Sequence, residues 1–231
     1  MCGRFVGFRN LEELKQYFPI DQSNCQIAAN YNVAPTQAIL AIYKSGGLNV
    51  LEKFHWGLVP FWAKDANIGY KMINARTETV ASKPSFREAF KKRRCLILAD
   101  GFYEWKGEKG AKQPMFFTLP DKSPFAFAGL WEIWRDKQNE DAIYRSCTII
   151  TREAVGVMQQ IHHRMPVILH PDAYDTWLAP DNRDPNSLHL ILQSKALTDL
   201  VFYPVANQVN SVRNSDPSNI QPVQIEFDFK V

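Results

Sequence analysis

Short apolar segments rich in β-branched and aromatic residues follow one another along most of this 231-residue chain, with turn-forming residues between them. Segments of this kind are typical of β-strands. We expect strands at Ala38–Tyr43, Val50–Trp56, Cys95–Ala99, Phe102–Trp105, Met115–Leu119, Phe125–Trp131, Ser146–Thr151, Met165–Leu169 and Val223–Phe229. Gly46-Gly47 and the polar stretch Lys106–Gln113 are expected to form hairpin turns. Since no strand–helix–strand alternation is present, the sequence predicts an α+β fold with a mostly antiparallel sheet or barrel-like core.

A few short helices are expected at the periphery of this sheet. Asn10 and Glu13 match a capping box, in which each side chain bonds the backbone N–H of the other residue. Ser85 and Glu88 repeat the same pattern. Two further helices are expected at Asp172–Leu178 and Asn186–Leu192.

Nothing in the sequence divides the chain into parts. It contains no internal repeat, low-complexity segment or linker, so we expect a single domain over residues 1–231. The net charge of +3 permits an anionic partner without requiring one. No apolar run approaches the roughly 18 residues of a membrane span, and the N-terminus lacks the apolar stretch of a signal peptide. We therefore expect a cytoplasmic monomer that does not contact a membrane.

The four cysteines are Cys2, Cys25, Cys95 and Cys147. None of them forms a C-x-x-C pair, so neither a zinc ribbon nor a thioredoxin-type redox motif is present. We expect a reduced protein without metal or cofactor, in which the three interior cysteines are buried as small apolar residues.

Five polar clusters interrupt the predicted scaffold: Cys2–Arg4, Tyr31–Pro35, Ile73–Glu78, Ala99–Trp105 and Ile161–Pro166. Taken one at a time, each has a structural interpretation. Asn32 is consistent with turn chemistry, and Glu104 with an outward-facing carboxylate on a strand. Asn74 and Arg76 share one face of an extended segment, as a surface hydrogen-bonding pair would.

The adjacent histidines His162 and His163 are expected to point to opposite sides of an extended segment. They therefore do not suit a single metal ion together, and one of the two is expected to be structural.

Taken together, the clusters match a known family. The motifs MCGRF, YNVAPTQ, INARTET, LADGFYEWK and IHHRMPVIL, in this order, resemble the SRAP (SOS response-associated peptidase) family from residue 2 to about residue 214. The ordered set is far more specific than any one motif. The resemblance implies a DNA-damage protein that cross-links covalently to abasic sites in single-stranded DNA through Cys2, after Met1 has been removed.

The position of Cys2 suits this chemistry. Once Met1 is removed, Cys2 carries a thiol and a free α-amine whose ordinary pKa is about 8. The amine can add to the aldehyde of a ring-opened abasic sugar as a Schiff base. The thiol can then close on the imine carbon to give a thiazolidine, and a cysteine elsewhere in the chain could not close this ring.

The resemblance also implies roles for other residues. Asn74 corresponds to the asparagine that orients the N-terminal cysteine, and Glu104 to the catalytic glutamate that moves protons during imine formation. His162 corresponds to the histidine that assists opening of the sugar ring, whereas His163 occupies a variable position and receives no catalytic role.

The implied DNA contacts involve arginines and one aromatic residue. Arg4, Arg76 and Arg164 would bind phosphates next to the lesion. Trp62 would stack on a neighbouring base. Some relatives carry a second aromatic residue after this one. Here that position is Ala63, for which Phe61 is a partial substitute.

Two other functions use the same residues. Cys2, Glu104 and His162 could form an N-terminal-nucleophile site that removes the protein's own N-terminal residues, as the family name suggests. Alternatively, the protein could be a non-covalent reader of modified bases in single-stranded DNA. That function would explain Trp62 and the arginines but would leave Cys2 without a role.

Overall fold

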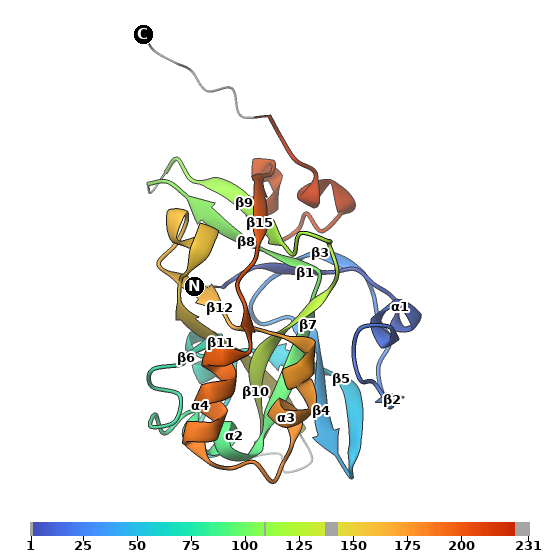
Figure 1. Ribbon diagram of the computed structural model, residues 1–231, viewed down its shortest axis with the longest axis vertical. Coiled ribbons are helices and arrows are strands. Elements are labelled where there is room, and N and C mark those ends of the chain that lie inside the picture. The colour runs from blue at the N-terminus through green and yellow to red at the C-terminus, as the bar shows by residue number, and fades with distance from the viewer. Residues whose placement is uncertain (1, 109, 137–142, 225–231) are drawn as a thin grey trace.

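The computed structural model describes residues 2–108, 110–136 and 143–224, and within them the chain forms two β-sheets flanked by short helices (Figure 1). The smaller, five-stranded sheet has the order β15 (Val201–Pro204), β9 (Gln113–Thr118), β8 (Gly101–Lys106), β1 (Phe5–Gly7) and β3 (Asn30–Val33). The larger, ten-stranded sheet runs β12 (Arg164–Pro166), β11 (Ile143–Glu153), β5 (Leu48–Trp56), β4 (Ala38–Ser45), β7 (Arg94–Ala99), β10 (Phe125–Arg135), β13 (Ile168–Leu169) and β14 (Ala196–Leu197). β2 (Gln22–Ser23) pairs with β5, and β6 (Asn74–Arg76) pairs with β11.

Among the described residues, most strand pairs are antiparallel, and the parallel pairs are β11–β5, β11–β6 and β2–β5. The predicted α+β class with a mostly antiparallel sheet is therefore confirmed. The α-helices are α1 (Leu11–Lys15), α2 (Arg87–Lys92), α3 (Tyr174–Leu178) and α4 (Pro185–Ser194). The 3-10 helices are η1 (Ala66–Lys71), η2 (Gly156–Gln160), η3 (Pro171–Ala173), η4 (Asn207–Asn210) and η5 (Pro217–Ile220).

Several local predictions can be compared directly with these elements. The Asn10–Glu13 capping box is confirmed, with the two reciprocal hydrogen bonds at 3.0 and 2.9 Å. The Ser85–Glu88 capping box is wrong, because α2 follows Phe86 and has no side-chain cap. Phe86 is buried in the core, so its packing decides where this helix begins.

Seven of the nine expected strands lie where the sequence placed them, apart from a few residues at their ends. The expected strand Met165–Leu169 is interrupted at Val167, whose N–H donates to Ile150 and whose carbonyl accepts from Ala128. Here the chain changes its pairing partner from β11 to β10. Most of the expected strand Val223–Phe229 lies outside the described residues.

A cluster of aromatic and aliphatic side chains joins the two sheets. Phe5 and Phe102 come from the smaller sheet, and Trp56, Ile97 and Phe127 from the larger one. The Phe5 ring meets the Trp56 ring edge-on, with centroids 5.2 Å apart. Because fully burying such a side chain stabilises the fold by about 1.5 to 3 kcal/mol, this contact fixes the N-terminal strand against the larger sheet.

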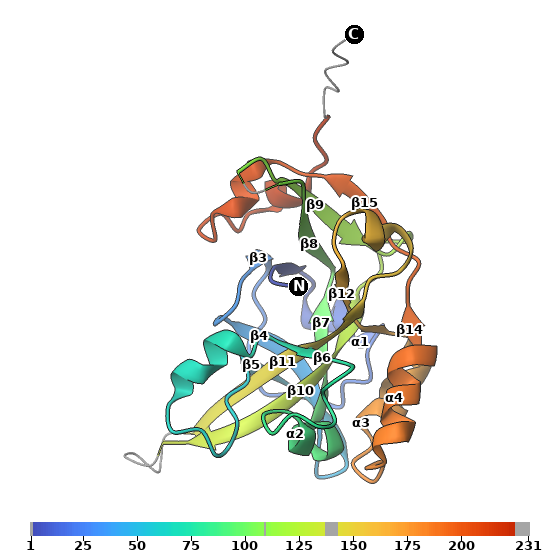
Figure 2. The ribbon, with the colours of Figure 1, turned by 90° about the vertical axis from the view of Figure 1, so that its left-hand side faces the viewer.

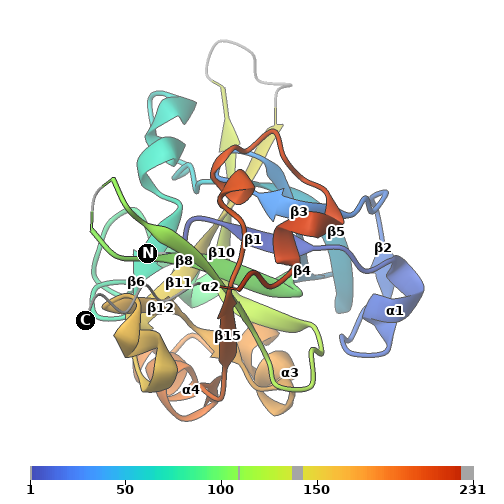
Figure 3. The same cartoon turned by 90° about the horizontal axis from the view of Figure 1, so that it is seen from above.

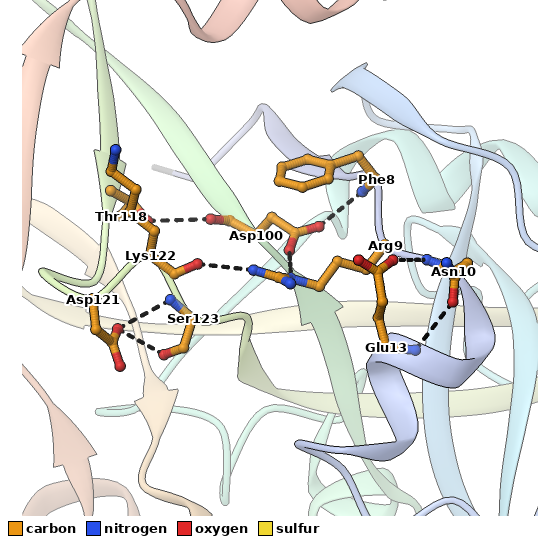
Figure 4. Close-up of polar contacts among 9 residues, drawn as sticks. All are labelled: Phe8, Arg9, Asn10, Glu13, Asp100, Thr118, Asp121, Lys122 and Ser123. Atoms are coloured by element: carbon orange, nitrogen blue, oxygen red, sulfur yellow. Dashed lines mark hydrogen bonds and ion pairs between the residues drawn. The ribbon is translucent and has the colours of Figure 1, made fainter.

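The end of β1 is fixed to β8 by the buried carboxylate of Asp100 (Figure 4). Asp100 accepts the backbone N–H of Phe8 at 2.8 Å and Nε of Arg9 at 2.7 Å. Arg9 also donates to the Lys122 carbonyl at 3.0 Å. Residue 101 is glycine because a Cβ there would lie 2.2 Å from the Phe116 ring. These contacts set the register in which Phe5 lies opposite Phe102.

No helix in the described part of the chain is both long enough and apolar enough to span a membrane.

We predict that Asp100→Ala lowers the free energy of unfolding by about 2 to 3 kcal/mol, because it removes the partner of Arg9 and leaves the Phe8 N–H unpaired. Urea unfolding measures this change. Asp121→Ala is the matched control, since Asp121 accepts from Ser123 at the exposed surface nearby (Figure 4). Equal losses in the two variants would contradict the anchoring role of Asp100.

Candidate active site

The pairing of β1 with β8 brings Cys2 close to Glu104. The Tyr103 N–H donates to the Arg4 carbonyl at 2.9 Å, so the two chains stay in register beyond the end of β1. In this register Glu104 lies opposite Gly3, one residue from Cys2. Figures 2 and 3 show the start of the described chain beside β8 and β12.

Cys2 is fully buried, and its backbone carbonyl accepts from Nδ2 of Asn74 at 2.9 Å. Asn74 is presented by β6, where it lies opposite Ile149 of β11. Within the described residues, the buried Oδ1 of Asn74 has no hydrogen-bond partner. This amide therefore fixes the Cys2 carbonyl and also places an unused acceptor at the site.

Burial keeps the Cys2 thiol protonated. Removal from water raises its pKa above the ordinary value, and the negative charge of Glu104 raises it further. The opposing effect of the Arg4 backbone N–H is smaller. The thiol is thus a neutral S–H group rather than a ready thiolate.

Glu104 lies inside the protein and not on its surface. Glu104 is only 5% exposed, so its interpretation as an outward-facing carboxylate is wrong. Burial raises its pKa to about 7. A carboxyl group with this pKa can both release and accept a proton near neutral pH.

His162 follows η2 and is half-buried. Its Nδ1 lies 2.9 Å from the backbone nitrogen of Arg164 and 3.1 Å from the Arg164 carbonyl oxygen. With the ring proton on Nε2, Nδ1 accepts from the Arg164 N–H; with the proton on Nδ1, it donates to the carbonyl. Burial lowers the pKa of His162 to about 4. This histidine is therefore a neutral N–H donor at neutral pH.

The expectation that His162 and His163 point to opposite sides is wrong. Their rings stack with centroids 4.4 Å apart and an interplanar angle of 23°. The chain is not extended here, because Ile161 has helical backbone angles of φ −115° and ψ −45°. His163 is exposed.

One cation acts on two of the site residues. Lys112, at the end of the β8–β9 turn, lowers the pKa of both Glu104 and His162. For Glu104 this opposes the larger effect of burial, and for His162 it adds to it. These two residues, which are distant in sequence, therefore lie within range of the same ammonium group. Together with the Asn74–Cys2 hydrogen bond and the effect of Glu104 on Cys2, this gathers the four predicted catalytic residues into one site.

Two of the arginines expected to bind DNA are held by protein groups. Nη1 of Arg4 donates to Oδ1 of Asn32 and to the Val209 carbonyl, both at 2.7 Å. Arg164 is 6% exposed and forms a two-bond pair with Glu78 at 2.6 and 3.0 Å. The DNA contacts of these arginines remain predictions.

Arg76, Trp62 and Phe61 are exposed, the latter two by 45% and 58%. Ala63 is buried, and its carbonyl accepts Nε1 of Trp134 at 2.8 Å. Position 63 thus belongs to the core in this chain, and Phe61 is the available neighbour of Trp62 at the surface. Their contacts with DNA also remain predictions.

Sequence reasoning missed the roles of Asn32 and Glu78. Asn32 is fully buried, its Oδ1 accepts from Arg4 and its Nδ2 lies within hydrogen-bond distance of three carbonyls, so simple turn chemistry does not describe it. Glu78 is the partner of Arg164. Both lie within polar clusters visible in the sequence, but their partners lie tens of residues away. Within the described ranges, no group of three or more His, Cys, Asp or Glu side chains could hold a metal ion.

Comparisons with known proteins show which family the sequence matches. The family model described as SOS response associated peptidase (SRAP) matches residues 1–212. The abasic site processing protein YoqW of Bacillus subtilis is 46% identical over 224 residues, which cover 96% of this chain and 99% of that protein. The abasic site processing protein HMCES of Gallus gallus is 34% identical over 199 residues, 76% of this chain and 58% of that protein. A crystal structure of a protein from Bacteroides thetaiotaomicron has a TM-score of 0.84 and 25% identity, and covers 96% of this chain and 100% of that one.

We predict that the stability difference between wild type and Glu104→Gln depends on pH. Between the unfolded value of 4.5 and the folded value of about 7, the folded protein holds a proton that the unfolded chain releases. The wild type therefore loses stability as the pH rises through this interval, by about 3 kcal/mol, whereas the glutamine variant does not. Urea unfolding at about pH 5 and about pH 7.5 tests this, with Glu12→Gln on the exposed face of α1 as the control. A stability difference that stays constant with pH would contradict the raised pKa of Glu104.

Proposed function

Because the chain belongs to the SOS response associated peptidase family, we propose that it processes abasic sites in single-stranded DNA by forming a covalent cross-link through Cys2 after Met1 has been removed. The observation that carries this proposal is the burial of Cys2 and Glu104 at the N-terminal end of β1, with Asn74 bonded to the Cys2 carbonyl. The names of the relatives supply the substrate class. Met1 lies outside the described residues, so its removal remains a prediction.

In the first step, the α-amine of mature Cys2 attacks the aldehyde carbon of the ring-opened sugar. A C–N bond forms and the carbonyl oxygen leaves as water, which requires proton transfer. Glu104 suits this transfer because a pKa of about 7 allows it to give a proton to the departing oxygen and to regain one from the nitrogen. Asn74 fixes the Cys2 backbone during the attack through its bond to the carbonyl.

In the second step, the thiol adds across the imine. Sulfur bonds to the imine carbon and the thiol proton ends on nitrogen, which gives the thiazolidine ring without any further reactant. A thiol with a raised pKa suits this order of events, since it remains protonated until the imine has formed. In the tautomer that carries the proton on Nε2, His162 would donate this proton as a hydrogen bond to a sugar oxygen during ring opening, while Nδ1 accepts from the Arg164 N–H.

We place the DNA strand next to this site. Arg76 would bind a phosphate, and Trp62 with Phe61 would stack on a base. Arg4 and Arg164 would contribute further phosphate contacts near the lesion. The protein would act as a cytoplasmic monomer, bound to the nucleoid when it is on DNA.

We predict that the mature protein forms a heat-stable cross-link with single-stranded DNA containing one abasic site, seen as a shifted band on a denaturing gel. Cys2→Ala and chemical blocking of the α-amine should each abolish the band, because the ring needs both groups. If amine blocking has no effect, the thiol acts alone and the thiazolidine is wrong. If the wild type cleaves its own N-terminus but gives no band, the peptidase alternative is favoured.

We predict that Glu104→Gln slows cross-linking by about 10²- to 10⁴-fold, since the amide cannot transfer protons. The rate of band formation at saturating DNA measures this effect. His163→Ala is the control, because His163 is exposed and has no part in the proposed steps. A large rate defect in His163→Ala together with a normal rate in Glu104→Gln would overturn the assignment of roles.

A further inference from the structure

Asn32 is a fully buried amide that joins three segments of the chain. Its Oδ1 accepts Nη1 of Arg4 at 2.7 Å. Its Nδ2 lies within hydrogen-bond distance of the carbonyls of Val209, Ser211 and Asn214, at 3.1, 2.9 and 2.6 Å. The side chain therefore connects β3, the N-terminal strand and the segment that follows η4.

The same contacts fix the orientation of the Arg4 guanidinium. Both protons of Nη1 are used, one by Asn32 and one by the Val209 carbonyl. The guanidinium also lies over the Trp105 ring, with its central carbon 5.7 Å from the ring centroid. Nε of Arg4 is buried and has no hydrogen-bond partner in the described part of the protein. Because Nε is shielded from solvent, a ligand at the surface would meet Nη2, which makes no hydrogen bond within the described residues. The contacts of Nη1 hold the guanidinium plane from the other side.

We propose that Asn32 is a positioning residue for DNA binding, which holds Arg4 so that its remaining donors receive a phosphate of single-stranded DNA. This inference rests on the proposed function only for the identity of the ligand. An asparagine is needed because one side chain must accept from a cation and donate to carbonyls at the same time. Aspartate would place a carboxylate against the carbonyl oxygens, and alanine would release Arg4.

A purely structural role would be to hold residues 209–214 in place, and a second buried amide allows the two roles to be separated. Asn219 is also fully buried, and its Nδ2 donates to the same Asn214 carbonyl, at 2.7 Å. Among the hydrogen bonds of the described residues, Asn219 makes none to Arg4. Asn219→Ala therefore disturbs the same segment and leaves the Asn32–Arg4 bond intact.

The test compares Asn32→Ala with Asn219→Ala in binding to an undamaged single-stranded oligonucleotide, measured by fluorescence anisotropy over a range of salt concentrations. Asn32→Ala should bind about tenfold more weakly, and its slope of log affinity against log salt should be shallower by about 0.7, the value for one lost phosphate contact on a single strand. Asn219→Ala should keep the wild-type slope. Equal slopes in both variants would overturn the proposal.

The rate of cross-linking provides a measurement that is independent of DNA affinity. At saturating abasic DNA, Asn32→Ala should cross-link within about threefold of the wild-type rate, because Asn32 does not contact Cys2 or Glu104, so the defect lies in binding and not in chemistry. A wild type that binds DNA but does not cross-link would overturn the proposed function and leave the role of Asn32 standing. If the wild type cross-links normally but Asn32→Ala and Asn219→Ala have equal salt slopes, the proposed function stands and the role of Asn32 is overturned.

A second variant covers the case in which Asn32→Ala does not fold. Arg4→Lys keeps the positive charge but lacks the planar fork that bonds Asn32 and Val209 together. It should also bind single-stranded DNA about tenfold more weakly than the wild type, with a shallower salt slope. Wild-type affinity and slope in Arg4→Lys would show that the held orientation is not needed.

Discussion

The pairing of β1 with β8 is the constraint on which the rest of the site depends. It places Cys2 and the residues that follow it between two sheets, where Cys2 is fully buried and Glu104 nearly so. The pairing is set at one end by the Asp100–Arg9 contact and along its length by the aromatic cluster around Phe5. A chain terminus is usually exposed and poorly ordered. Here the packing of β1 places Cys2, close to the start of the chain, at the centre of a site.

Burial has the same electrostatic effect on each of the reactive groups. Low solvent access disfavours the charged form, so it raises the pKa values of Cys2 and Glu104 and lowers that of His162. At neutral pH the Cys2 thiol and the His162 ring are therefore neutral, and Glu104 is close to the midpoint between its charged and neutral forms. Groups in this state suit a reaction in which an amine and a thiol add to a carbonyl carbon, since both nucleophiles act in their neutral forms or pass a proton to a neighbour.

The arginines around the site differ in what holds them. Arg76 is exposed, whereas Arg4 bonds Asn32 and Val209, and Arg164 bonds Glu78. An arginine whose planar fork is already fixed loses less conformational entropy when it binds a phosphate. The backbone N–H and carbonyl of Arg164 both lie within hydrogen-bond distance of Nδ1 of His162, so Arg164 contacts the site through its main chain as well.

The sequence alone determined what depends on neighbouring residues: the strands with clear apolar patterning, the Asn10–Glu13 capping box and the set of polar clusters that identified the family. It did not predict the short strands β1, β3 and β6, whose pairing partners are distant in sequence. Only the tertiary structure decided that Glu104 faces inward, that Asn32 holds Arg4, and that the two histidine rings stack. The physical reason is that a local pattern sets the backbone of a segment. Strand register and burial, which fix partners and pKa values, instead arise from contacts between residues far apart in the sequence, such as Arg4 with Asn32, 28 positions apart, and Arg4 with Val209, 205 positions apart.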